Sequence, residues 1–139
     1  MSLFLLFALF FLSLFVSLYD FRHASIPNWV TIPLFITGLF VNSPHPMEIY
    51  AFLISFWMAW KLGWMGGGDA KLWMGLIVSL PSAYQMLWII PLIFFATGAL
   101  QLLWRKIKGR ILTGVRSPGA WRTLVYLLVI LIQELSHAY

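Results

Sequence analysis

Long apolar stretches fill most of this sequence, and only short polar segments separate one stretch from the next. Of the 139 residues, 62% are hydrophobic and 9% are charged, whereas soluble domains carry about 25% charged residues. No soluble stretch is long enough to form a second core. The sequence therefore predicts an all-α integral membrane protein, with a single membrane-embedded domain that covers residues 1–139.

Prolines and polar turns divide the apolar sequence into six predicted transmembrane helices. Pro27 favours a helix start, residues 42–46 form a turn with two prolines, and Pro81 ends the fourth helix. The first stretch lacks the basic start and the small-x-small cleavage site of a signal peptide, so we expect it to be retained. The predicted helices cover residues 2–19, 27–41, 47–64, 70–80, 83–104 and 121–136, with Pro33 inside the second and Pro91 inside the fifth.

The basic residues all fall on one side of this arrangement. Arg22 follows the first helix, Lys61 and Lys71 flank the segment before the fourth, and the other six lie between residues 105 and 122. Loops rich in Lys and Arg face the cytoplasm, so both termini are expected on the non-cytoplasmic side. The same rule explains the net charge of +5 without an acidic partner, and no nucleic acid partner is expected.

Three consecutive glycines, Gly66 to Gly68, interrupt the apolar sequence directly before Asp69. Glycine costs about 1 kcal/mol relative to alanine in a helix, so the run is expected to break or loosen a helix. A broken helix at membrane depth is tolerated where it is buried in protein or lines a watery cavity, and an ionisable residue there indicates a functional site. Alternatively, the glycines serve close helix packing.

The other aspartate, Asp20, lies at the predicted end of the first helix. Two carboxylates that lie close together share a proton, so one can take a proton from water while the other donates a proton to a carbonyl oxygen. Such a pair indicates aspartic peptide hydrolysis. The alternatives are that Asp69 caps the fourth helix, that Asp20 pairs with Arg22, or that both act as a proton relay in a small non-enzymatic transporter or assembly subunit.

The predicted helices also give the two aspartates a depth and a role. From Trp29 to Val41 the second helix is about 20 Å long at 1.5 Å per residue, and the fourth helix is about 16 Å long, against about 30 Å for a bilayer core. Their inner ends are therefore expected in a hydrated pocket below the cytoplasmic surface. A helix dipole disfavours an anion at the carboxyl end and favours one at the amino end, so Asp69 is expected to be the base and Asp20 the protonated acid.

Taken together, these segments resemble the type IV prepilin peptidases, which are membrane aspartic proteases of the Gly-x-Gly-Asp type. The resemblance covers essentially the whole chain and rests on Tyr19-Asp20-Phe21-Arg22, Ile26-Pro27-Asn28 and Gly66-Gly67-Gly68-Asp69-Ala70-Lys71. It implies that Asp20 and Asp69 are the catalytic residues. It also implies that the remaining motif and substrate-binding residues are Ile26, Pro27, Asn28, Gly66, Gly68 and Lys71.

The resemblance further implies a substrate and a location. The substrate would be a prepilin or pseudopilin, whose short basic leader is cleaved at the cytoplasmic face of a prokaryotic inner membrane. Larger members of the family carry paired Cys-x-x-Cys motifs and methylate the new amino terminus, whereas this chain has no cysteine. It therefore resembles the short, peptidase-only members of tight-adherence (Flp-type) pili, with an archaeal preflagellin peptidase as an alternative.

The presenilin-like proteases also pair a Tyr-Asp with a Gly-x-Gly-Asp. Their chains carry a Pro-Ala-Leu motif in a later helix, and this shorter sequence contains none. The lack of cysteine excludes a disulfide, a Cys-based zinc site and a thiol nucleophile, and neither a metal nor a cofactor is expected. The sequence leaves open which prepilin is the substrate and whether it serves a pilus, a secretion system or an archaellum.

Overall fold

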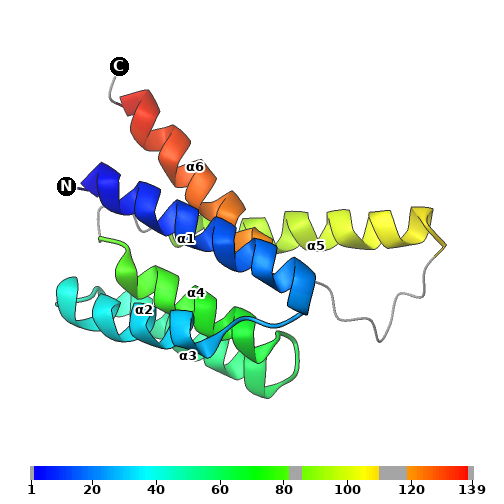
Figure 1. Cartoon of the computed structure of the whole chain (residues 1–139), viewed down its shortest axis with the longest axis horizontal. Helices are drawn as coiled ribbons and strands as arrows, with labels where there is room; N and C mark the ends of the chain where they lie inside the picture. Colours follow the sequence, from blue (N-terminus) through cyan, green and yellow to red (C-terminus); the bar gives the residue numbers. More distant parts are fainter. Residues whose placement is uncertain (1, 82–85, 110–118, 138–139) are drawn as a thin grey trace.

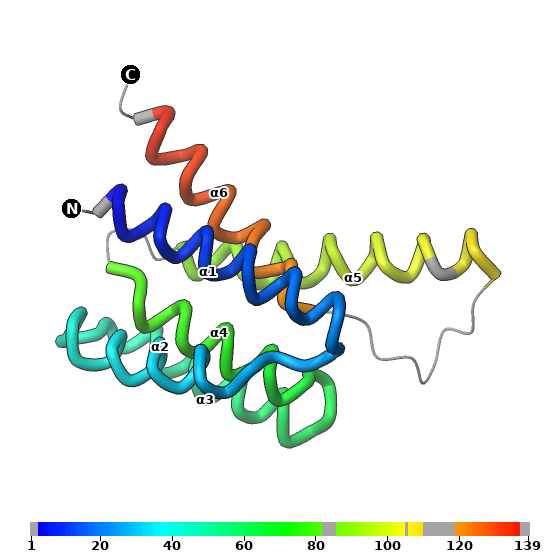
Figure 2. The backbone as a smooth tube through the Cα atoms, viewed as in Figure 1, coloured from blue at the N-terminus to red at the C-terminus, as the bar shows by residue number. Residues whose placement is uncertain are grey.

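A computed structural model describes residues 2–81, 86–109 and 119–137, and within these ranges the chain forms six α-helices and no strand (Figure 1). The helices are α1 Ser2–His23, α2 Asn28–Val41, α3 Met47–Lys61, α4 Gly67–Ser79, α5 Ile89–Ile107 and α6 Trp121–His137. Each helix runs in roughly the opposite direction to the helix before it (Figure 2). The all-helical class expected from the sequence is confirmed for this part of the chain.

Helix α4 lies at the centre of the packing. Eight of its 13 residues are buried, and it packs against both α2 and α3. Helix α6 packs against α1 and α5. Because Asp69 lies in the first turn of α4, the burial of this helix fixes the backbone that carries the carboxylate.

Trp73, one turn after Asp69 and 1% exposed, joins α4 to three other helices. Its ring centroid lies 5.7 Å from that of Phe56 in α3, 5.1 Å from that of Phe94 in α5 and 5.5 Å from that of Tyr126 in α6. Aromatic pairs at such distances contribute about 0.5–1.5 kcal/mol each beyond their buried area. This cluster therefore holds α3, α5 and α6 around the helix that carries Asp69.

Helices α2 and α4 approach each other closely at Gly38. A Cβ atom on Gly38 would lie 2.7 Å from both the backbone nitrogen and the hydroxyl of Ser79. The Ser79 hydroxyl donates to the Leu34 carbonyl (2.9 Å), and the Asn42 amide donates to the Ser79 carbonyl (2.8 Å). A small residue thus permits the crossing, as is common between membrane helices, and hydrogen bonds then tie the carboxyl end of α4 to α2.

The end of α3 differs from the sequence-based prediction of Trp64, since the helix ends at Lys61. Gly63 has a φ of +74°, a left-handed conformation that costs glycine little. The Gly63 amide donates to the Trp60 carbonyl (3.0 Å) and the Trp64 amide to the Ala59 carbonyl (2.9 Å). This pair of bonds is the Schellman arrangement that ends many helices, and Gly63 was its signal in the sequence.

Three further helix boundaries also differ from the predictions. Helix α1 continues through Asp20 to His23. Helix α4 begins at Gly67, so two of the three glycines are helical and the expected break is confined to the residues before them. Helix α5 begins at Ile89, which places Pro91 in its first turn, where a missing N–H costs nothing. The start predicted for this helix, at residue 83, lies outside the described residues.

Among the described residues, one helix is long and apolar enough to cross a membrane by length and composition, at Leu3–His23. Helix α2 and the segment Ile89–Trp104 are shorter apolar helices. Helices α2 and α4 have 14 and 13 residues, about 21 Å and 20 Å at 1.5 Å per residue, so both are shorter than a bilayer core of about 30 Å. The six-span topology with non-cytoplasmic termini stays a prediction.

Candidate active site

Asp20 lies in the last turn of α1 and is 3% exposed. Its backbone carbonyl accepts a hydrogen bond from the Ala24 amide (2.8 Å), so the helical hydrogen bonding continues past Asp20. Its side-chain Oδ2 accepts a hydrogen bond from the Gly119 amide, 3.2 Å away. Gly119 lies just before α6 and is 99 positions distant in the sequence, so the packing of α1 against α6 creates this contact.

Asp69 lies in the first turn of α4, at the amino end of the helix, as the sequence predicts. Gly66 precedes the helix in an extended conformation, and its carbonyl accepts a bond from the Ala70 amide (3.0 Å). The side chain of Asp69 is half-buried and lines a cavity. The helix dipole and the free amides of a first helical turn favour a negative group at this position.

The two aspartates meet at Gly119. While the Gly119 amide donates to Asp20, a Cβ atom on Gly119 would lie 2.5 Å from Oδ2, 2.8 Å from Cγ and 2.9 Å from Oδ1 of Asp69. Both carboxylates therefore contact the same residue, although they come from helices α1 and α4. Gly119 therefore brings the two carboxylates into one site.

The other motif residues join the two polar segments to each other. A Cβ atom on Gly68 would lie 2.9 Å from Cβ of Ile26, which is buried. The Lys71 ammonium donates to Oδ1 of Asn28 (3.1 Å). Pro27 precedes α2 in an extended conformation. The segment after Asp20 is thus fixed against the helix that carries Asp69, by one steric contact and one hydrogen bond.

Gly68→Ala is expected to lower turnover more than Gly67→Ala does. A Cβ at Gly68 meets the β-carbon of Ile26, which cannot move without its backbone, whereas a Cβ at Gly67 lies 2.8 Å from the indole nitrogen of Trp60. That indole can swing aside, because Trp60 is exposed at the end of α3. Misplacing a reacting group by about 1 Å costs about 100-fold in rate. Turnover and melting temperature of both variants check this, and equal turnover would contradict it.

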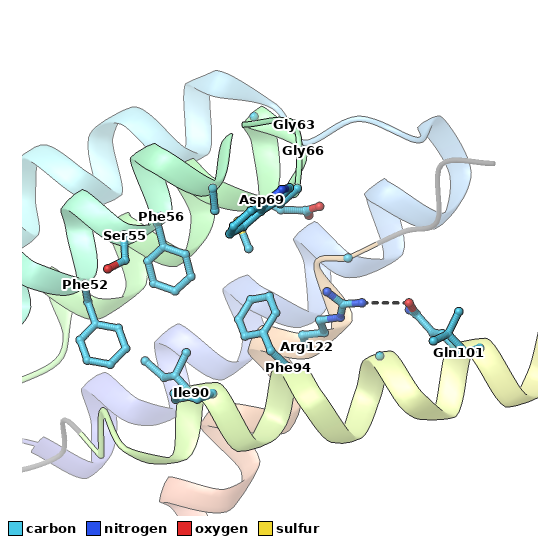
Figure 3. Close-up of a pocket in the computed structure, with 18 residues that line it drawn as sticks. Phe52, Ser55, Phe56, Gly63, Gly66, Asp69, Ile90, Phe94, Gln101 and Arg122 are labelled. Carbon is cyan, nitrogen blue, oxygen red and sulfur yellow. Dashed lines mark hydrogen bonds between the residues drawn. The ribbon is translucent and has the colours of Figure 1, made fainter. Parts of the chain in front are cut away.

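A cavity of about 940 Å³ opens beside Asp69 (Figure 3). Helices α3 and α5 contribute apolar walls, with Phe52, Phe56 and Ile90 at one end. The other end is polar and includes Asp69, Gln101 and Arg122, with Gly66 beside Asp69. Gly67 and Gly119 also line the cavity. The cavity therefore has an apolar end and a polar end, and Asp69 lies at the polar one.

Arg122 brings a positive charge to the polar end of the cavity. Its Nη2 donates to Oε1 of Gln101 (2.8 Å), its guanidinium carbon lies 5.3 Å from the ring centroid of Phe94, and its charge interacts with the Asp69 carboxylate. Its Nε is buried and has no hydrogen-bond partner among the described residues. The sequence-based interpretation grouped Arg122 with the basic loop residues and did not place it in the site.

Gly119 was also absent from the sequence-based site. It stands in a basic segment that the sequence analysis interprets as a cytoplasmic loop. Its contact with Asp20 is between residues 99 positions apart, and no feature of a single sequence indicates such a contact. The only local signal is the small-residue pair Gly119-Ala120 directly before an apolar helix. Among the described residues, no group of three or more His, Asp and Glu side chains is placed to hold a metal ion.

The helix ends used to assign roles to the two aspartates are only partly as expected. Helix α1 continues for three residues past Asp20 to His23, so Asp20 lies within the last turn and not at its end. Asp69 lies in the first turn of α4. A helix dipole acts within the first and last turns, so the choice of Asp69 as base and Asp20 as acid stays a prediction.

Comparison with known proteins identifies a family for this chain. The model of the type IV leader peptidase family matches residues 6–104, well over half of the chain, including both aspartates and the residues that join their segments. No curated protein and no solved structure matches. The resemblance to prepilin peptidases is thereby confirmed, and the chain belongs to the type IV leader peptidase family.

Proposed function

We propose that the chain is an aspartic endopeptidase that removes the basic leader from a type IV prepilin or pseudopilin, with Asp20 and Asp69 as its catalytic pair. The observation that carries the proposal is that both carboxylates contact Gly119. Asp20 accepts a hydrogen bond from the Gly119 amide, and the Asp69 carboxylate occupies the space that a side chain at Gly119 would fill. Membership of a leader peptidase family supports peptide hydrolysis as the reaction and prepilins as its substrates.

The chemistry follows from placing two carboxyl groups in one site. Like charges at short distance do not both ionise readily, so the pair holds one proton between its members. The ionised carboxylate takes a proton from water, which attacks the carbonyl carbon of the scissile bond. The protonated carboxyl donates to the carbonyl oxygen, which gives a tetrahedral gem-diol. The carboxyl that took the proton from water then gives it to the leaving nitrogen as the C–N bond breaks. The other carboxylate takes a proton back from a hydroxyl of the gem-diol as the C=O bond re-forms. Both products are released with the carboxyl pair again holding one proton.

The cavity supports the choice of substrate. Its polar end contains Asp69 and Arg122, while Phe52, Phe56 and Ile90 form an apolar wall beyond them. In this proposal the apolar segment that follows the leader lies along the wall, and the scissile carbonyl comes within about 3–3.5 Å of the attacking water. Motif residues Ile26, Pro27, Asn28, Gly66, Gly68 and Lys71 hold the surrounding backbone.

Cleavage by purified protein in lipid vesicles tests the function. A Flp-type prepilin is added, and mass spectrometry locates any new amino terminus. We expect a single cut after the basic leader, with no dependence on a proton gradient. Proton flux through the vesicles with an uncut prepilin would instead support a proton-relay subunit and would end the peptidase proposal.

The proposal also includes an orientation in the inner membrane, with the site toward the cytoplasm and both termini on the other side. Arg22 and Lys61 lie at the carboxyl ends of α1 and α3, Lys108 directly follows α5, and Lys71 lies near the amino end of α4. Because successive helices alternate in direction (Figure 2), these ends fall on the side of the two aspartates, in keeping with the positive-inside rule. Single cysteines at Ser43 and Lys108, both exposed, are therefore expected to react with impermeant maleimide from opposite faces. The native chain has no cysteine to interfere, and labelling from one face would contradict six spans.

A further inference from the structure

Gly119, Ala120 and Thr123 are buried and hydrogen-bonded at the amino end of α6. Gly119 and Ala120 are buried, and the Thr123 hydroxyl donates to the Ala120 carbonyl (2.6 Å). Thr123 also hydrogen-bonds through its hydroxyl to Ser13 of α1. The Arg122 amide donates to the Gly119 carbonyl (3.1 Å). The backbone of Gly119 is thus tied to α6 and α1, so it has little room to retreat from the two carboxylates.

We propose that Gly119 is a positioning residue of the active site, whose amide holds the Asp20 carboxylate and whose missing side chain admits the Asp69 carboxylate beside it. The proposal rests on the aspartic peptidase function proposed above. The family match ends at residue 104, so family membership by itself assigns no role to Gly119. Gly119 is instead linked to Asp20 and Asp69 by its contacts in the folded chain.

The steric part of the proposal has a clear consequence for alanine. A Cβ at Gly119 would lie 2.5–2.9 Å from all three carboxylate atoms of Asp69, and real Cβ atoms essentially never approach other atoms closer than 3.0 Å. Because the Gly119 amide donates to Asp20 in α1 and its carbonyl accepts from the Arg122 amide in α6, the group that must move is the side chain of Asp69. An alanine at Gly119 therefore separates the two carboxylates while leaving both of them in the protein.

Kinetics of Gly119→Ala provide the first test. We expect kcat to fall about 100-fold, as a displacement of about 1 Å predicts, with KM changed less than threefold. Gly38→Ala is the control for steric crowding away from the two aspartates, because its Cβ would lie 2.7 Å from the backbone nitrogen and the hydroxyl of Ser79 at the far end of α4. That control is expected to lower the melting temperature and to leave kcat of the folded protein unchanged.

A crosslinking measurement tests positioning without activity. In this cysteine-free chain, the double variant Asp20→Cys, Asp69→Cys is treated with a short bifunctional thiol reagent, and the crosslinked fraction is measured. Adding Gly119→Ala is expected to lower that fraction, whereas adding Gly38→Ala is expected to leave it unchanged. Failure of the parent pair to crosslink would overturn the juxtaposition on which the proposal depends.

The two proposals fail in different ways. If native protein cleaves prepilin and Gly119→Ala cleaves it with native kcat, the positioning role is refuted while the peptidase function stands. The positioning role is also refuted if Gly119→Ala and Gly38→Ala lower kcat and crosslinking equally, since crowding alone would then explain both. If native protein does not cleave prepilin but the cysteine pair responds to Gly119→Ala as expected, the peptidase function fails and the positioning of the two side chains stands.

Discussion

Asp20→Asn and Asp69→Asn are each expected to lower kcat for prepilin cleavage by about 100- to 10,000-fold, the usual contribution of general acid–base catalysis. Asparagine has nearly the shape of aspartate but cannot exchange a proton with water or with the scissile carbonyl. Its amide oxygen can still accept the bond that the Gly119 amide donates to Asp20. The loss is therefore expected without loss of folding or membrane insertion.

The two other acidic residues of the chain supply matched controls. Glu48 lies in the first turn of α3 and Glu134 lies in α6, and neither lines the cavity beside Asp69. Glu48→Gln and Glu134→Gln remove one carboxylate each and are expected to cleave at the native rate. Initial rates on purified proteins, normalised to the folded fraction, measure the difference. A folded Asp69→Asn variant with a tenth or more of native kcat would contradict the catalytic role.

Trp73→Ala is expected to destabilise the fold by about 3–5 kcal/mol, the usual range for truncating a large buried aromatic residue. Its ring contacts Phe56, Phe94 and Tyr126, so the change removes the contacts that join α4 to α3, α5 and α6. In a membrane protein the loss comes mainly from packing, since lipid tails are as apolar as the side chain that is removed. Trp73→Phe is expected to cost less, because part of the ring contact remains.

Thermal unfolding in detergent measures this loss against an exposed tryptophan. Trp29 is 68% exposed, so Trp29→Ala is expected to change stability by no more than about 0.5 kcal/mol. Equal melting temperatures for Trp73→Ala and Trp29→Ala would contradict the central place given to Trp73. Because Trp73 lies one turn from Asp69, the folded fraction of Trp73→Ala is also expected to lose activity.

The sequence predicts the helical class and the position of Asp69 well, because both depend on local features. An almost uninterrupted apolar chain favours helices, Pro27 marks the start of α2, and the glycine run marks the start of α4. The end of α3 was misplaced although its signal, Gly63, was present. A long apolar run hides a single glycine, whose left-handed conformation ends the helix.

The candidate site was predictable only in part, because some of its residues are brought together by contacts between positions far apart in the sequence. Asp20, Asp69 and the Ile-Pro-Asn segment stand in motifs that can be found by inspection. Gly119 and Arg122 stand in a basic segment that the positive-inside rule already explains, so nothing local separated them from its other residues. Their contacts with Asp20, Gln101 and Phe94 exist only after α6 packs against α1 and α5.

The central claim is that Asp20 and Asp69 act on the peptide bond as one unit, and a double-mutant cycle tests it most directly. The kcat for prepilin cleavage is measured for the native protein, Asp20→Asn, Asp69→Asn and the double variant, each purified and folded. Residues that act as a unit have strongly non-additive effects. We therefore expect the double variant to be no slower than the slower single variant, whereas losses that multiply would contradict a shared catalytic pair.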